Sequence, residues 1–139
     1  MAKILLVEDD PLQREQYALF LRSKDGGGHD VEEAESATKA VNLIRKEKYD
    51  LVLLDIMMAY GPEDEKNPEI KDFEVDYGRK MGVYVYNEAR KLSKPPRIAL
   101  ISVVDDYGVL SEFPDVVGYL SKYFEEQELL RFILHCLSR

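Results

Sequence analysis

The chain has 139 residues, which is enough for one domain with its own hydrophobic core, and we expect a single domain over residues 1–139. Its 27 acidic and 19 basic residues give a net charge of −8, so the average surface repels nucleic acids. The sequence shows no leader pattern and no apolar stretch of the roughly 18 residues that span a bilayer. We therefore expect a cytoplasmic protein that binds neither membranes nor nucleic acids directly.

Strands and helices are predicted to alternate along the chain. Residues 3–7 and 49–57 are apolar runs too short for a typical helix, which is typical of buried strands in a parallel sheet. In chain order, the five predicted strands cover about residues 3–7, 29–34, 49–57, 97–103 and 116–120. The five predicted helices cover about residues 11–25, 37–44, 81–92, 105–113 and 125–137. The alternation predicts an α/β fold, a five-stranded parallel sheet covered on both faces by helices.

Local signals indicate where helices begin and end. Asp10 can cap a helix whose first residue is Pro11, and Ser36 can cap the second helix. Three glycines at residues 26–28 favour a turn after the first helix. Cys136 lies among apolar residues of the last predicted helix and is interpreted as a small core residue.

Polar side chains follow four of the five predicted strands. Because parallel strands end at the same edge of a sheet, we expect these side chains to converge; they are Glu8, Asp9, Asp55, Ser102 and Lys122. Clustered carboxylates repel one another unless a cation joins them, and Mg²⁺ prefers oxygen ligands. An aspartate can attack phosphorus, while lysine and serine can bind phosphoryl oxygens. The set suits metal-assisted phosphoryl transfer onto Asp55.

Taken singly, each of these residues has an ordinary structural explanation. Asp55 could cap a turn, Ser102 could form a turn, and Lys122 could be a solvated surface lysine. Their joint placement at strand ends favours the functional interpretation.

Four segments together resemble the receiver domain of two-component response regulators, in the family's order along the chain. They are Ile4-Leu-Leu-Val-Glu-Asp-Asp-Pro11, Tyr49-Asp-Leu-Val-Leu-Leu-Asp-Ile-Met-Met58, Ala99-Leu-Ile-Ser102 and Gly118-Tyr-Leu-Ser-Lys122. The resemblance spans residues 3–137 apart from residues 60–80, and it implies a doubly wound sheet with strand order 2-1-3-4-5.

The resemblance also implies roles for individual residues. Asp55 would be the phosphoacceptor, with Ser102 as the switch hydroxyl and Lys122 paired with a phosphoryl oxygen. Mg²⁺ would be bound by Asp9, Asp55 and the backbone carbonyl of Met57, with Glu8 acting mainly through water. Tyr119 matches the switch aromatic that swings inward on activation; the alternative is a surface or half-buried strand tyrosine.

Some positions depart from the family pattern. Ala59 and Tyr123 stand where the family usually has proline, and Val103 stands where it usually has a small residue. The glycine that opens the next helix best matches Gly82, which follows Asp55 by 27 residues, so an insertion of about 19 residues is implied beside the site.

The favoured function is a phosphorylatable receiver, supplied by a sensor histidine kinase, a phosphotransfer protein or a small phosphodonor. It would act on a downstream protein target or a fused output domain, and it would catalyse only its own phosphorylation and dephosphorylation. The chain could be a stand-alone receiver or part of a longer protein. A pseudo-receiver, a binding module that is not phosphorylated, is the alternative. An aspartyl phosphatase is disfavoured because Met57 replaces its second acid.

Residues 60–80 show no sustained helical period and are expected to form a long inserted loop. Residues 61–80 hold seven acids and four bases, which favours a solvated, mobile loop. The alternative is a partner-contacting arm that uses Tyr60, Phe73 and Tyr77. Neither His29 nor His135 is expected to relay phosphoryl groups, and both are interpreted as surface or half-buried residues.

Overall fold

The sheet is built from five parallel strands in the order β2-β1-β3-β4-β5. The computed structural model describes residues 1–70, 80–103 and 111–139. The strands are β1 (Lys3–Val7), β2 (Asp30–Ala34), β3 (Leu51–Asp55), β4 (Ile98–Ser102) and β5 (Gly118–Ser121). The predicted fold class and strand order are confirmed.

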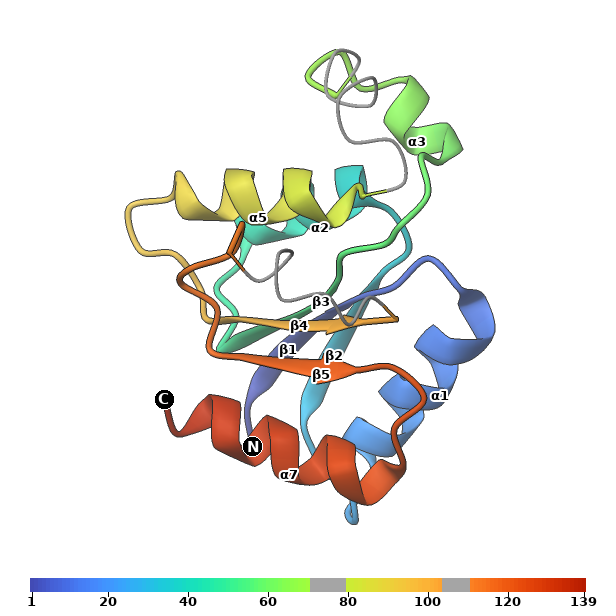
Figure 1. Cartoon of the computed structure of the whole chain (residues 1–139), viewed down its shortest axis with the longest axis vertical. Coiled ribbons are helices and arrows are strands. Elements are labelled where there is room, and N and C mark those ends of the chain that lie inside the picture. Colours follow the sequence, from blue (N-terminus) through green and yellow to red (C-terminus); the bar gives the residue numbers. More distant parts are fainter. Residues whose placement is uncertain (71–79, 104–110) are drawn as a thin grey trace.

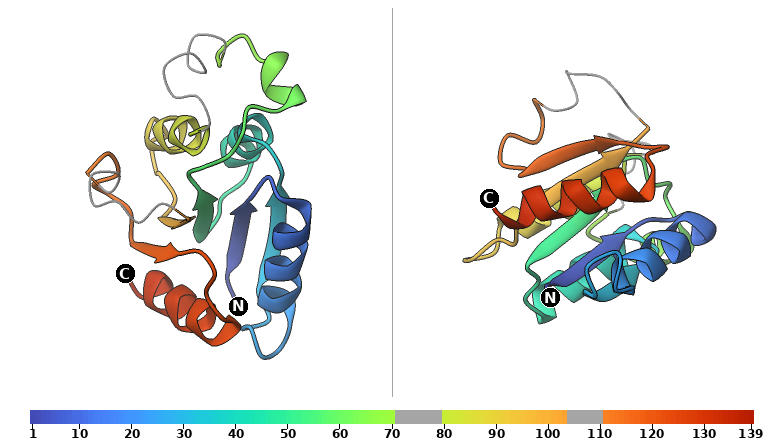
Figure 2. Two further views of the ribbon diagram at one scale, coloured as in Figure 1. Left: turned by 45° about the vertical axis from the view of Figure 1, so that its right-hand side comes forward. Right: turned by 90° about the horizontal axis from the view of Figure 1, so that it is seen from below.

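Helices cover both faces of this sheet. They are α1 (Pro11–Arg22), α2 (Ala37–Lys46), α3 (Pro62–Glu65), α5 (Gly82–Arg90) and α7 (Glu126–Leu137). Figures 1 and 2 show α1 and α7 on one face, and α2 and α5 on the other. The helix predicted at residues 105–113 lies mostly outside the described residues. No helix in the described ranges is long and apolar enough to cross a membrane.

Two hydrophobic cores lie on either side of the sheet, because successive strand residues point to opposite faces. In β1, Leu5 and Val7 belong to the core beneath α2 and α5, whereas Ile4 and Leu6 belong to the core beneath α1 and α7. Every residue of β3 is buried, as expected of a central strand covered on both faces. Cys136 is buried in the second core, as predicted.

Both predicted helix caps are present. The carboxylate of Asp10 accepts hydrogen bonds from the backbone N–H groups of Leu12 and Gln13, at 2.9 and 3.2 Å, and Pro11 opens α1. The Ser36 hydroxyl accepts from the N–H of Lys39 at 3.1 Å at the start of α2. These caps fix the points at which the chain leaves the sheet edge and enters each helix.

The segment from residue 60 onward is not wholly a solvated loop. It contains the short helix α3, which Figure 1 shows beyond the α2–α5 layer, and Ile70 is fully buried in the core. The prediction failed here because the contacts that order this segment are long-range. The possible strand at Phe73, Val75 and Tyr77 falls outside the described residues.

A buried carboxylate ties α3 to α2. Asp64 is fully buried, and its Oδ1 accepts hydrogen bonds from the Thr38 hydroxyl at 2.6 Å and from the Thr38 N–H at 3.1 Å. Its Oδ2 accepts from the N–H of Gly61 at 2.9 Å. The Asp64 side chain therefore satisfies donors at the first turn of α2 and at the start of α3.

We predict that Asp64→Ala lowers the free energy of unfolding by about 2–4 kcal/mol, because three partly buried donors lose their buried acceptor. Urea denaturation measures the change. Glu65→Ala is the matched control: Glu65 is exposed on the same helix, and its loss should change stability by less than about 0.5 kcal/mol. Equal effects of the two substitutions would contradict the anchoring role of Asp64.

His29 is more buried than expected, with 8% of its surface exposed. Its Nδ1 accepts a hydrogen bond from the N–H of Ala2 at 3.1 Å, across the start of β1. Burial, together with the positive chain terminus, lowers the pKa of His29 below 6.5. His135 is exposed, as predicted.

This environment predicts a pH-dependent contribution to stability. The unfolded chain binds a proton at His29 more readily than the folded chain, so this contribution is full above pH 6.5 and is lost as pH falls toward the folded pKa. The destabilisation caused by His29→Gln should therefore be larger at about pH 7.5 than at about pH 5.5 in urea denaturation. His135→Gln should show no such difference; a pH-independent cost at His29 would contradict the prediction.

Candidate functional site

The residues predicted to converge do lie at one edge of the sheet. Asp55 and Ser102 are the last residues of β3 and β4, while Glu8 directly follows β1 and Lys122 directly follows β5. The N–H of Lys122 donates to the Ser102 carbonyl at 2.8 Å, which extends the β4–β5 pairing by one residue. The parallel register thus sets the positions of these side chains.

The ammonium of Lys122 lies between two buried carboxylates. It bonds Asp55 Oδ2 at 3.0 Å and forms a still shorter contact with Glu8 Oε1. All three side chains are at most 8% exposed. Lys122 therefore connects the ends of β1, β3 and β5 through charge-assisted hydrogen bonds.

The pKa shifts in this cluster follow from burial and charge. Burial raises the pKa of Glu8, and the adjacent Asp55 raises it further, to about 8, against the opposing attraction of Lys122. Burial lowers the pKa of the Lys122 ammonium, but its bonds to Glu8 and Asp55 outweigh that effect and raise it above 10.5. The ammonium of Lys122 therefore does not offset the combined effect of burial and Asp55 on the pKa of Glu8.

Asp9 completes the acidic cluster. One oxygen from each of Glu8, Asp9 and Asp55 lies within 4.8 Å of the others. Asp9 Oδ2 accepts from the N–H of Ala59 at 3.1 Å, and Asp55 Oδ1 accepts from the N–H of Met57 at 3.0 Å. Clustered carboxylates repel one another unless a cation joins them, and Mg²⁺ prefers oxygen ligands, so the donor set fits that metal.

The acids open onto a surface pocket. Its lining combines Glu8, Asp9, Asp55 and Lys122 with residues from the start of α1, and Met57 also contributes. Two further lining residues, Val103 and Tyr123, are 50% and 84% exposed. A ligand that reaches Asp55 would therefore pass apolar side chains at the pocket rim.

Tyr123 adopts a backbone conformation that differs from that expected of proline. Its φ is 68°, in the left-handed region that proline cannot enter, and no peptide bond among the described residues is cis. Tyrosine in place of proline at position 123 is therefore accompanied by a different local backbone. The next residue, Phe124, stacks on Tyr17 with ring centroids 5.2 Å apart.

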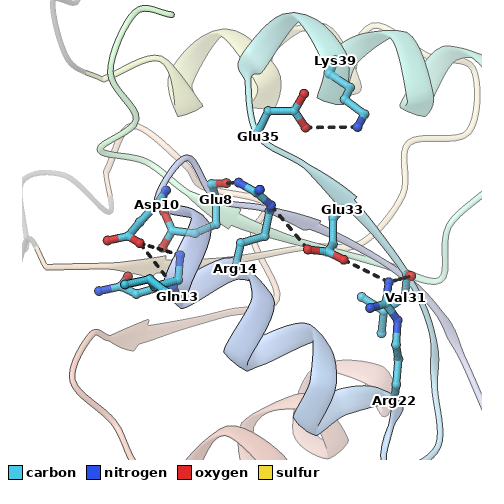
Figure 3. A network of polar contacts seen from close by, with 10 residues as sticks. Glu8, Asp10, Gln13, Arg14, Arg22, Val31, Glu33, Glu35 and Lys39 are labelled. Atoms are coloured by element: carbon cyan, nitrogen blue, oxygen red, sulfur yellow. Dashed lines mark hydrogen bonds and ion pairs between the residues drawn. The ribbon is translucent and has the colours of Figure 1, made fainter.

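Arg14 is a contributor that sequence reasoning missed. Its Nη1 donates to the backbone carbonyl of Glu8 at 3.0 Å, and its Nε lies 3.4 Å from the carboxylate of Glu33 (Figure 3). The guanidinium thus ties the end of β1 to β2 from helix α1. The signal in the sequence that could have indicated this role is a basic residue, Arg14, one helical turn after the cap at Asp10.

Gly82 allows α5 to approach the end of β3. A Cβ at this position would lie 2.5 Å from the Asp55 carbonyl oxygen and from the Ile56 Cα, and the Gly82 N–H donates to the Ile56 carbonyl at 3.1 Å. A larger residue would push the helix away from the strand that carries Asp55. This contact gives a physical reason for glycine at position 82, which the resemblance to receiver domains matched to the glycine that opens the helix.

The two expected switch residues are not in the pocket lining. Ser102 is fully buried beside the exposed Val103. Tyr119 is half-buried, packs against the core beneath α2 and α5, and has a buried hydroxyl oxygen. The structure thus brings together the three acids and Lys122, whereas Ser102 and Tyr119 do not line their pocket.

Comparisons with known proteins agree with this architecture. Residues 4–61 match the family model of the response regulator receiver domain. The chain is 25% identical over 129 residues to the sensory transduction protein LytT of Bacillus subtilis (93% of this chain, 45% of that protein). It is 27% identical to LytR of Staphylococcus haemolyticus (91% and 42%). The chain spans less than half the length of these two relatives.

Solved structures share the fold over almost the whole chain. The response regulator TrrA of Thermotoga maritima, in complex with Mg²⁺ and beryllofluoride, has a TM-score of 0.71 and 26% identity, with coverage of 98% of this chain and 99% of that one. A CheY-like receiver domain protein of Methanospirillum hungatei has a TM-score of 0.73 and 22% identity, with coverage of 99% and 94%. The family match over residues 4–61, the relatives and the fold show that this chain is similar to the receiver domains of response regulators.

Proposed function

We propose that this receiver accepts a phosphoryl group on Asp55 in a Mg²⁺-dependent reaction. The observation that carries the proposal is the Lys122 ammonium held between Glu8 and Asp55 at the edge of an acidic pocket. A buried ammonium at this point can bind a phosphoryl oxygen as soon as the group reaches Asp55.

In the proposed step, a carboxylate oxygen of Asp55 attacks phosphorus and forms the P–O bond of an acyl phosphate. The P–N bond of a phosphohistidine breaks, and the imidazole keeps the electron pair and takes a proton from water; with a small donor such as acetyl phosphate, the P–O bond breaks and the carboxylate leaves as the anion. Asp55 Oδ1 already accepts the N–H of Met57, which holds the carboxylate in one orientation. Lys122 compensates charge on the transferred group.

Asp9, Asp55 and the Met57 carbonyl would hold Mg²⁺, with Glu8 acting mainly through water, and the ion would neutralise charge on the phosphoryl oxygens. The carboxylate oxygens of Glu8, Asp9 and Asp55, which lie within 4.8 Å of one another, support this assignment. Support also comes from the relative TrrA, which binds Mg²⁺ and beryllofluoride.

The partners follow from this chemistry. A sensor histidine kinase or a phosphotransfer protein would supply the group, and Ser102 and Tyr119 would couple it to a protein-interaction surface. The readout would be a downstream protein or a fused output domain, consistent with the greater length of LytT and LytR. The receiver would form one domain over residues 1–139, work in the cytoplasm, and turn over no substrate besides its own aspartyl phosphate.

A pseudo-receiver is the second candidate, and the pocket rim favours it. Val103 and Tyr123 place exposed apolar side chains where a donor must approach. Such a protein would bind partners through the same fold without a phosphorylation cycle. The two candidates differ in one measurable property, the formation of a phosphoryl adduct.

We predict that incubation with acetyl phosphate and Mg²⁺ adds one phosphoryl group to the intact protein, as measured by mass spectrometry. Asp55→Asn should abolish the adduct, because its amide cannot act as the nucleophile. Asp50→Asn is the matched control, since Asp50 is exposed and precedes the same strand at its other end, and it should leave the yield unchanged.

The absence of an adduct would not by itself exclude a receiver that accepts only from a kinase. Beryllofluoride binding, measured by fluorine NMR with and without Mg²⁺, separates the cases. A folded protein that forms no adduct and binds no beryllofluoride would contradict the proposal and favour the pseudo-receiver.

We also predict that Val103→Ala speeds both phosphorylation by acetyl phosphate and loss of the group, by about three- to ten-fold, because a small donor and water gain access to Asp55. The time course of intact mass gives both rates. Leu134→Ala, which trims an exposed apolar residue on α7, should leave them unchanged. Unaltered rates in Val103→Ala would show that this side chain does not restrict access.

A further inference from the structure

A second pocket lies at the opposite edge of the sheet, where β3 and β4 begin. It is formed by the chain between α2 and β3 and by the chain between α5 and β4. Figure 1 shows the α5–β4 connection at the left of the sheet, whereas the strand arrows end at the right, and Asp55 is the last residue of β3. The pocket is therefore separated from the acidic site by the length of the central strands.

Unpaired positive charge distinguishes this pocket. Lys46, Lys48, Lys94 and Arg97 line it, all four are exposed, and none forms an ion pair with any residue in the described ranges. Arg45, which also lines it, is already paired with Glu69 and Glu88 at 3.2 and 2.9 Å. The chain has a net charge of −8, whereas the charge of this pocket is positive.

The two acids in the lining are engaged elsewhere. Glu47 pairs with Lys3 at 3.0 Å and accepts the Tyr49 hydroxyl at 3.1 Å. Asp50 accepts the backbone N–H of Lys3 at 2.8 Å. Both carboxylates are thus bonded to Lys3 near the start of β1, and neither forms an ion pair with Lys46, Lys48, Lys94 or Arg97.

The helix dipole of α2 gives a structural reason for one of these four bases. Lys46 lies in the last turn of α2, where a cation offsets the negative end of the helix. Lys48, Lys94 and Arg97 lie beyond the ends of α2 and α5, and the dipole effect falls off within the last turn. These three bases therefore have no ion-pair partner within residues 1–70, 80–103 and 111–139.

We propose that this basic pocket binds an acidic, extended peptide segment of a partner protein. Small phosphate-bearing ligands are usually held by buried, convergent donors, whereas these bases are exposed. Exposed lysines attract a run of carboxylates and adapt to it, while Leu92, Pro95 and Pro96 form an apolar wall for its side chains. Nucleic acid is a poorer match, because the rest of the surface repels a long polyanion.

Binding here is independent of the proposed phosphorylation, because the pocket shares no residue with the acidic site. A partner held at this edge would leave Asp55 open to a kinase. The receiver could then remain tethered to an acidic partner throughout its phosphorylation cycle.

The test is fluorescence anisotropy of a labelled hexaglutamate peptide titrated with the intact chain. Lys48→Glu/Arg97→Glu should weaken binding at least about ten-fold, because it reverses two of the unpaired charges. Lys24→Glu/Arg131→Glu changes the net charge equally at exposed positions outside the pocket and should weaken binding by less than about two-fold. Asp55→Asn should bind like the unmodified chain, so failure here is distinct from failure of phosphorylation.

Three results would overturn the proposal. The first is equal loss of affinity in both double variants, which would indicate non-specific charge attraction. The second is tighter binding of inorganic triphosphate or a short DNA duplex than of hexaglutamate, at the same pocket. The third is self-association of the chain that Lys48→Glu/Arg97→Glu abolishes, which would assign the pocket to a second copy.

Discussion

The buried contact of Lys122 with Glu8 and Asp55 is the interaction on which the site depends. It joins the ends of β1, β3 and β5, which are far apart in sequence, around one ammonium. Removing one partner from such a buried pair costs about 3–5 kcal/mol, because a charge is left uncompensated. In the same cluster, burial and the neighbouring Asp55 raise the pKa of Glu8 despite the attraction of Lys122. The constraint that stabilises this edge therefore also favours a cation there.

Two helices keep the cluster in place from outside the sheet. Helix α1 begins at the Asp10 cap, and its Arg14 holds the carbonyl of Glu8. Helix α5 begins at Gly82, close against the end of β3. Asp55 is thus supported by its own strand, by the turn at Met57 and by a helix that only a glycine permits so near. Such support is what a nucleophile needs if its orientation is to be fixed before the donor arrives.

The sequence was most informative where the governing interactions are local or strictly periodic. Apolar runs predicted strands β1, β3 and β4, and Asp10 and Ser36 capped the helices that their positions indicated. Parallel strands then implied that Asp55 and Lys122 meet. Long-range contacts escaped prediction: Asp64 finds its partner Thr38 across 26 residues, which orders α3. His29 is buried by packing that its glycine-rich neighbourhood does not reveal.

The most direct test of the central claim is chemical identification of the phosphorylated residue. Borohydride reduces an acyl phosphate on aspartate to homoserine, which peptide mass spectrometry can locate. After treatment with acetyl phosphate and Mg²⁺, we expect homoserine at position 55 and none when Mg²⁺ is removed. Homoserine at Asp9 or Asp10 instead, or formation without Mg²⁺, would contradict the assignment of Asp55 as a metal-assisted phosphoacceptor.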